Sequence, residues 1–181
     1  MKQNYCAFCS EKLSGEVCDC CGKSITDYHT APHWLLPGTV LAGKYEVGAV
    51  LGEGGFGITY IGRDTNLDMK VAIKEYFPSG VVNRNNTSSM EISALVGDTQ
   101  ANFEKGKQGF LSEARTLAKF SNEQSIVSVR DFFEENNTAY IVMEYLEGTD
   151  LKDYIQQKGK VSFQEALKML SPIMSSLSKI H

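Results

Sequence analysis

The chain has 181 residues, of which 42% are hydrophobic, so it is long enough for one ordinary domain with a core or for a smaller domain with an appendage. Its 18 basic and 22 acidic residues give a formal net charge of −4. Binding to a phosphate backbone needs a concentrated surface of Lys and Arg, so this near balance argues against a nucleic-acid partner.

The N-terminus lacks the apolar run of a signal peptide. No later stretch reaches the roughly 18 consecutive apolar residues of a membrane span. We therefore expect a cytoplasmic chain with no membrane segment among the printed residues. A segment beyond residue 181 is left open.

The five cysteines all lie within residues 6–21, in a pattern typical of a metal site. Two C-x-x-C knuckles separated by eight residues can offer four thiolates to one tetrahedral Zn²⁺. So short a segment cannot bury a core of its own, so the metal would be what folds it. We predict a zinc-ribbon-like segment over residues 1–24, and its ligands are Cys6, Cys9, Cys18 and Cys21.

The cysteines could instead form disulfides, and other side chains could contribute metal ligands. Disulfides are disfavoured by a reducing cytosol and by an odd number of thiols. Cys20 is expected to be a spare thiol, although it could share ligation with Cys18. His29 and His33, in the adjoining stretch, could reach a metal, but we expect solvated side chains there.

Residues 25–44 have the composition of a linker, with apolar side chains that could dock on the next part of the chain: Leu35, Leu36, Val40 and Leu41. From residue 45 the pattern predicts strands at 45–51, 58–63 and 69–77. A polar insert comes next at 79–101, with a strand-like stretch at 90–96.

A helix is predicted after the insert, because apolar residues recur at helical spacing up to Ala118 with Asn102 as a plausible N-cap. Glu113 lies beside its apolar face, where it can reach inward. Two strands at 126–133 and 138–145 should form a hairpin.

Beyond Gly148 the apolar period becomes helical. We expect a short helix at 150–158, and then a long one that begins at a capping box of Ser162 and Glu165 and is kinked at Pro172. The long helix carries an apolar stripe that needs a partner, and the printed chain supplies none.

The glycines at 52, 54 and 57 predict a phosphate-binding turn, because backbone N–H groups can approach phosphate oxygens where no Cβ stands in the way. Lys74, in the run Val-Ala-Ile-Lys, can bring a positive charge to the same phosphates. The residues at 58–61 are β-branched or aromatic, so the chain returns as a strand rather than opening the helix of a dinucleotide fold. We expect a hairpin lid over a nucleotide.

The order of these features resembles that of the bacterial eukaryotic-type serine/threonine protein kinases. The features are the glycine-rich lid, the lysine, the helix with its glutamate, the hairpin, and the connector Met-Glu-Tyr-Leu-Glu-Gly at 143–148. The resemblance implies an α+β fold: a five-stranded antiparallel sheet with one helix forms an N-lobe at 45–147, and the first helices of an incomplete C-lobe occupy 148–181. With the zinc ribbon and the linker, this completes the expected domain division.

The resemblance also implies roles for individual residues. Lys74 would meet the α- and β-phosphates of ATP and pair with Glu113, for which Glu104 is the competing candidate. Met143 would be the gatekeeper, and Glu144 and Leu146 would offer main-chain groups to adenine. The remaining cofactor-binding positions are the lid glycines Gly52, Gly54 and Gly57, the base-sandwiching Leu51, Thr59 and Ala72, and Asp150 near the ribose.

The implied activity is transfer of a phosphoryl group from Mg·ATP to Ser or Thr of protein substrates. The catalytic H-R-D loop and the D-F-G metal site of the family come after the connector, and the printed chain contains neither. We therefore expect these residues to be inactive alone, with the Mg²⁺ ligands outside them. The chain is then either the front part of an active kinase or a non-catalytic nucleotide- or zinc-binding regulatory protein.

Overall fold

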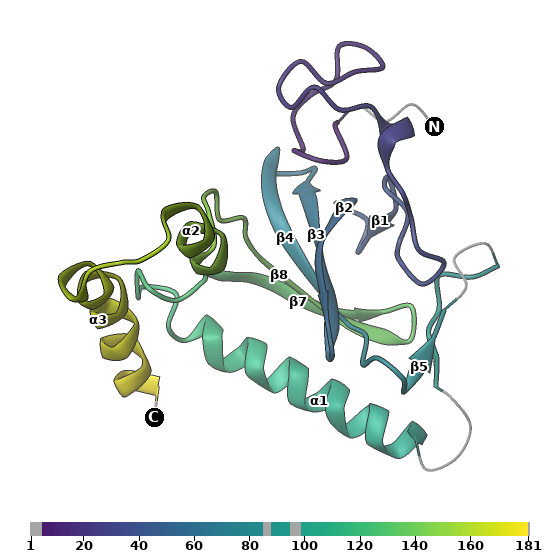
Figure 1. Cartoon of the computed structure of the whole chain (residues 1–181). Helices are drawn as coiled ribbons and strands as arrows, with labels where there is room; N and C mark the ends of the chain where they lie inside the picture. The colour runs from purple at the N-terminus through teal and green to yellow at the C-terminus, as the bar shows by residue number, and fades with distance from the viewer. Residues whose placement is uncertain (1–4, 85–87, 95–98, 181) are drawn as a thin grey trace.

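The computed structural model describes residues 5–84, 88–94 and 99–180 and is built around one antiparallel sheet (Figure 1). This six-stranded sheet has the order β1-β2-β3-β4-β8-β7. Its strands are β1 (Val40–Leu41), β2 (Tyr45–Gly54), β3 (Gly57–Asp64), β4 (Met69–Tyr76), β7 (Val129–Glu135) and β8 (Thr138–Glu144).

The expected five-stranded sheet is present as β2, β3, β4, β8 and β7, and the short strand β1 adds a sixth at the edge. Val40 and Leu41 pair with Glu46 and Tyr45, and Leu41 is fully buried. Leu35 is fully buried as well. The stretch expected to be a linker therefore packs on the sheet through Leu35 and Leu41, whereas Leu36 and Val40 remain exposed.

Three expected strand boundaries were wrong. The strand predicted at 45–51 continues to Gly54 as β2. The strand predicted at 126–133 begins only at Val129, because the backbone N–H of Ile126 closes a turn onto the carbonyl of Glu123. Of the stretch predicted at 90–96, only β6 (Ser93–Ala94) is a strand, paired with β5 (Val82–Asn83). Residues 95 and 96 lie outside the described residues.

The helix α1 (Thr99–Ala118) packs against β7 and β8. Its buried face is the one that the apolar spacing predicted, with Phe103, Phe110 and Ala114 in the core. Asn102 is not the N-cap, because the helix already includes Thr99 and Asn102 lies exposed within its first turn.

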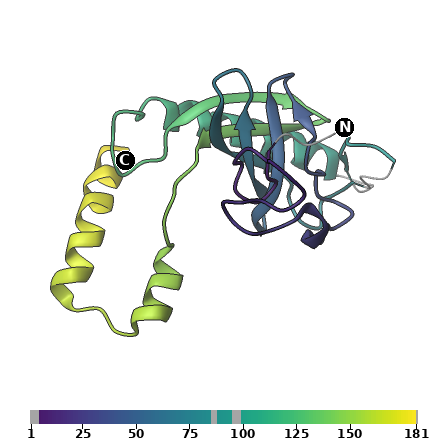
Figure 2. The same ribbon diagram turned by 90° about the horizontal axis from the view of Figure 1, so that it is seen from above.

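A 3-10 turn (η1, Ile25–Asp27) leads from the cysteines towards the sheet, and two helices close the chain. These are α2 (Leu151–Lys158), capped by Asp150, and α3 (Phe163–Ile180), which includes Pro172. Figure 2 shows both standing away from the sheet. The apolar stripe of α3 is exposed, with Phe163 at 80% and Met174 at 65%. Among the described residues, no helix is long and apolar enough to cross a membrane.

Candidate nucleotide site and cysteine cluster

The glycine-rich segment forms the expected hairpin between β2 and β3. Gly52 pairs with Thr59 and Gly54 with Gly57, so the turn falls at Gly55 and Phe56. The side chain of Phe56 is 78% exposed at the tip. A Cβ at Gly57 would lie 2.3 Å from the carbonyl oxygen of Glu75 in β4, so only glycine permits this close approach.

Lys74 lies on the central strand β4, between Thr59 of β3 and Ile141 of β8. Directly paired residues point to the same face of an antiparallel sheet, so Lys74 and Thr59 face the same side. The Nζ atom of Lys74 is 4.0 Å from Oε1 of Glu113 on α1 and 5.5 Å from the ring centroid of Phe110. The structure therefore brings together the lysine and the glutamate that the helical spacing singled out.

The competing glutamate has other partners. Glu104 forms an ion pair of 2.9 Å with Lys107, one turn further along α1. Its Oε1 also accepts a hydrogen bond from Gln100. Lys74 and Glu113 keep exposed side-chain fractions of 34% and 55%, so both groups are accessible from solvent.

Two of the residues expected to hold the adenine, Ala72 and Met143, lie further along the same sheet face. Ala72 pairs with Met143, two residues along from the pair of Lys74 and Ile141. Leu51 lies where the β2–β3 register shifts and is 47% exposed. This arrangement puts small and apolar side chains beside the lysine, as a stacked base requires.

The connector between the sheet and α2 is anchored at both ends. The side chain of Glu144 accepts a hydrogen bond from the N–H of Ser128, 2.8 Å away. Leu146 is 67% exposed. Asp150 caps α2 by accepting from the N–H of Asp153, which occupies one carboxylate oxygen. The second oxygen is chemically competent to accept from a ribose hydroxyl.

The cysteine segment brings four thiols to one point. The Sγ atoms of Cys6, Cys9, Cys18 and Cys21 all lie within 4.8 Å of one another. Two of the distances, Cys6 to Cys21 and Cys9 to Cys18, are 3.6 Å. A tetrahedral Zn²⁺ with Zn–S bonds of about 2.3 Å needs S···S edges of about 3.8 Å, so the geometry fits a closed thiolate site. The cysteines are free, and Cys20 lies exposed outside the cluster.

The thiols of the cluster differ in their acidity. Backbone hydrogen bonds from Cys21 and Cys20 lower the pKa of the Cys18 thiol to about 7, against the opposing effect of burial. Burial raises the pKa of Cys6 and of Cys9. His33 does not join this group, because its ring contacts Glu53 instead.

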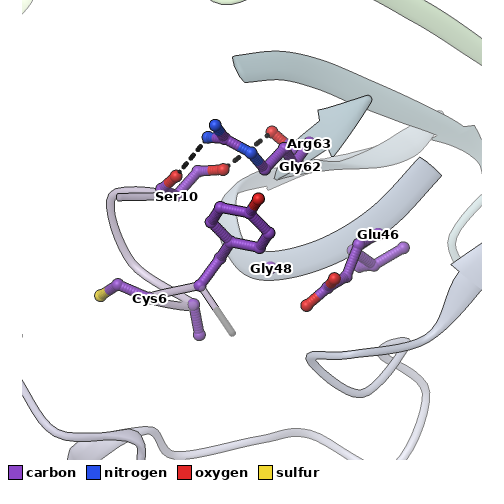
Figure 3. A pocket seen from close by; sticks show the side chains of 9 residues that line it. Cys6, Ser10, Glu46, Gly48, Gly62 and Arg63 are labelled. Atoms are coloured by element: carbon purple, nitrogen blue, oxygen red, sulfur yellow. Dashed lines mark hydrogen bonds between the residues drawn. The ribbon is translucent and has the colours of Figure 1, made fainter. Parts of the chain in front are cut away.

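The cysteine segment docks beside β2 and β3 (Figure 3), at the end of the sheet away from α1 (Figure 1). The carbonyl of Ala7 accepts from the N–H of Ala49 at 2.7 Å, and a Cβ at Gly48 would lie 2.5 Å from that same oxygen. Arg63 donates to the carbonyl of Ser10 at 2.7 Å. Backbone contacts this close indicate a fitted surface rather than a loose appendage.

Two contacts at the sheet had no signal in the sequence. Glu53, inside the glycine-rich segment, binds His33 and Trp34. Arg84, inside the polar insert, binds Glu75. Both depend on where distant segments come to lie in space, which neither periodicity nor a local motif encodes.

Comparison with known proteins identifies the family. The protein kinase domain family matches residues 45–181, three quarters of the chain, and the chain therefore belongs to that family. The sheet, the packed helix and the glycine hairpin are the corresponding parts of its N-lobe.

The relatives are bacterial serine/threonine-protein kinases. The chain is 31% identical over 147 residues to the serine/threonine-protein kinase PrkC of Bacillus subtilis, covering 81% of this chain and 19% of that protein. It is 32% identical over 145 residues to the probable kinase PknB of Lactococcus lactis, covering 80% of this chain and 20% of that protein. The chain thus spans about a fifth of the length of these relatives.

Two further similarities add to this result. The solved structure of PpkA-294, apo form, superposes with a TM-score of 0.64 at 36% identity, over 69% of this chain and 43% of that one. Serine/threonine-protein kinase B of Synechocystis is 26% identical over 168 residues, or 92% of this chain. The kinase match comprises 137 residues (45 to 181), so this longer alignment extends into the cysteine-containing part.

Proposed function

We propose that residues 45–181 form the ATP-binding half of a protein kinase that transfers the γ-phosphoryl group of Mg·ATP to Ser or Thr of protein substrates. The observation that carries the proposal is the position of Lys74, one strand from the glycine hairpin and 4.0 Å from Glu113. Phosphoryl transfer asks a protein mainly for positioning and for stabilisation of charge. A lysine that is oriented by a carboxylate and lies beside a glycine-rich turn can position the phosphates and stabilise their charge.

In this proposal each part of the site has one task. The lid backbone at Gly52, Gly54 and Gly57 covers the phosphates, and Lys74 binds the α- and β-phosphates. The base stacks between Leu51, Thr59 and Ala72, with Met143 behind it. Main-chain groups of Glu144 and Leu146 bind its edge, and Asp150 binds the ribose. Mg²⁺ is held by residues outside the printed chain.

The exposed stripe of α3 supports the view that more of the helical lobe belongs to the functional protein. Leu167, Leu170 and Leu177 are each more than 40% exposed. Burial of an apolar side chain of this size stabilises a fold by about 1.5–3 kcal/mol. Such a stripe is the surface on which the remaining C-lobe helices would pack.

The proposal is tested by calorimetric titration of ATP into residues 1–181. Lys74→Met should weaken ATP binding at least about tenfold, because a charge-assisted contact to phosphate is lost. The matched control is Lys152→Met, an exposed lysine on α2. Equal affinities for wild type, Lys74→Met and Lys152→Met would contradict the assigned site.

We further propose that the cysteine cluster binds one structural Zn²⁺ through Cys6, Cys9, Cys18 and Cys21. The support is the pair of S···S distances of 3.6 Å, from Cys6 to Cys21 and from Cys9 to Cys18. The corresponding division of the chain is a zinc-ribbon-like segment at 1–24, a connecting stretch at 25–44 and the partial kinase domain from 45.

A further inference from the structure

Glu53, a residue of the glycine-rich hairpin, anchors the hairpin on the sheet face opposite to Lys74. Glu53 pairs with Ile58, and Ile58 pairs with Glu75, so these three side chains share one face of the sheet. Thr59 and Lys74 share the other face. The carboxylate of Glu53 is therefore directed away from the phosphate side, where a second negative charge would oppose nucleotide binding.

Glu53 is bound by the segment that leads from the cysteines to the sheet. We name residues 28–34 the arm. Nε2 of His33 lies 3.0 Å from Oε1 of Glu53, and Nε1 of Trp34 donates to Oε2 at 2.9 Å. Both carboxylate oxygens thus contact consecutive residues of the arm, which fixes the direction of the side chain.

The arm is itself fixed to the sheet. Arg84, whose side chain is fully buried, donates through Nε and Nη2 to the carbonyl of His33, at 3.0 and 2.6 Å. The N–H of Val50 donates to the hydroxyl of Tyr28 at 3.1 Å. The atoms that bind Glu53 are consequently part of a rigid support and not of a free loop.

The arm is also continuous with the cysteine segment. The ring of Tyr28 stacks on Trp34, with centroids 6.4 Å apart, and meets Phe8 edge-on at 5.7 Å. Phe8 lies between Cys6 and Cys9 in the first knuckle. A chain of aromatic contacts therefore connects the metal-binding loop to Glu53.

We infer that Glu53 is a positioning residue that couples the cysteine segment to the nucleotide lid: the metal-loaded knuckle holds the arm, and the arm holds the glycine-rich hairpin in its nucleotide-binding position. The tip of the lid is also held by backbone hydrogen bonds, from Phe77 to the carbonyl of Phe56 at 3.2 Å and from Ser79 to the carbonyl of Gly55 at 3.1 Å, whereas Glu53 links the lid to the arm. An ordered lid loses less conformational entropy when ATP binds. This inference rests on the proposed nucleotide site.

The first test uses Trp34, the only tryptophan of the chain, as a reporter. In Glu53→Ala the Trp34 emission should shift to longer wavelength, because the indole N–H loses its hydrogen bond to Glu53 and meets more water. ATP affinity should fall about three- to tenfold, the effect of one or two such hydrogen bonds. Glu53→Gln should restore both, because its amide keeps an acceptor for Trp34.

The control is Glu134→Ala, which removes an exposed carboxylate that pairs with Lys107 and lies on the edge strand β7. It should change neither the emission nor the ATP affinity. Unchanged Trp34 emission in Glu53→Ala would overturn the contact whether or not ATP binds. A shifted emission with unchanged ATP affinity would overturn the positioning role.

The second test removes the metal. A chelator should shift the Trp34 emission and weaken ATP binding in the wild type by about the same three- to tenfold factor as Glu53→Ala. In Glu53→Ala the chelator should have little further effect on ATP affinity, because both changes break the same connection. If chelation weakens ATP binding in Glu53→Ala by the same factor as in the wild type, the coupling is wrong.

Failure of the inference and of the proposed function are distinguishable. If wild type binds no ATP while the emission responds to Glu53→Ala, the nucleotide site is wrong and the lid role falls with it. If wild type binds ATP through Lys74 and neither Glu53→Ala nor chelation alters that affinity, the site stands and only the coupling is wrong.

Discussion

Arg84 and Glu75 form a two-pronged ion pair whose side chains are both fully buried. Nη1 of Arg84 lies 2.6 Å from Oε1 of Glu75, and Nη2 lies 2.8 Å from Oε2. The hydroxyls of Tyr60 and Tyr140 donate to the same carboxylate at 2.9 and 2.8 Å. Burial and the negative charge of Glu75 raise the pKa of both phenols, so they remain neutral donors. The pair joins the polar insert to the centre of the sheet.

Arg84→Met should therefore destabilise the fold by about 3–5 kcal/mol, because it leaves the Glu75 charge buried without its partner. Urea unfolding monitored by circular dichroism measures this change. The double variant Arg84→Met/Glu75→Gln should cost clearly less than the two single changes added together.

The comparison for this prediction is an exposed ion pair. Lys179 and Glu123 lie 2.7 Å apart with side chains 51% and 30% exposed. Lys179→Met should cost less than about 1 kcal/mol. A similar cost for Arg84→Met and Lys179→Met would show that the buried pair does not stabilise this sheet.

The cysteine cluster should bind one zinc per chain. Cys9→Ser should abolish the bound metal, because the closed site loses a thiolate ligand. Cys20→Ser should leave it unchanged, because Cys20 is exposed and outside the cluster. Elemental analysis of the purified variants gives the stoichiometry, and equal loss of zinc from both would refute the ligand assignment.

Lys74 and Glu113 should act as a unit in ATP binding. Lys74→Met and Glu113→Gln, made singly and together, should show a coupling of about 0.5–3 kcal/mol in ATP affinity, because each change removes the same contact. Glu104→Gln serves as the control, since Glu104 pairs with Lys107. Additive effects of Lys74→Met and Glu113→Gln would mean that Glu113 is a solvated helix residue.

Local motifs predicted the kinase fold well. The glycine turn, the strand lysine and the amphipathic helix depend on residues close in sequence, so their spacing predicts the hairpin and the buried face of α1. The same spacing placed Glu113 on the side of the helix that reaches Lys74. These elements are confirmed because local propensity and tertiary packing agree in them.

The remaining features depend on tertiary contacts. The short strand β1 forms because Val40 and Leu41 meet the edge of β2, which the composition of a linker does not indicate. The acidic side chain of Glu53 gave no sign of its partners, since His33 and Trp34 lie about twenty residues earlier in the chain. The helix start at Thr99 was missed because Asn102 is a residue type common at N-caps, whereas in the structure it lies inside the helix.

We expect these 181 residues to bind ATP but to transfer no γ-phosphoryl group without the part of the domain that carries the catalytic loop. The direct test is an assay with γ-labelled ATP and a Ser/Thr-containing protein substrate. It compares residues 1–181 with a chain in which they are followed by the rest of the kinase domain, each with and without Lys74→Met. We expect no labelling by the shorter chain and Lys74-dependent labelling of Ser or Thr by the longer one. Lys74-dependent labelling by residues 1–181 alone, or none by a folded longer chain, would contradict it.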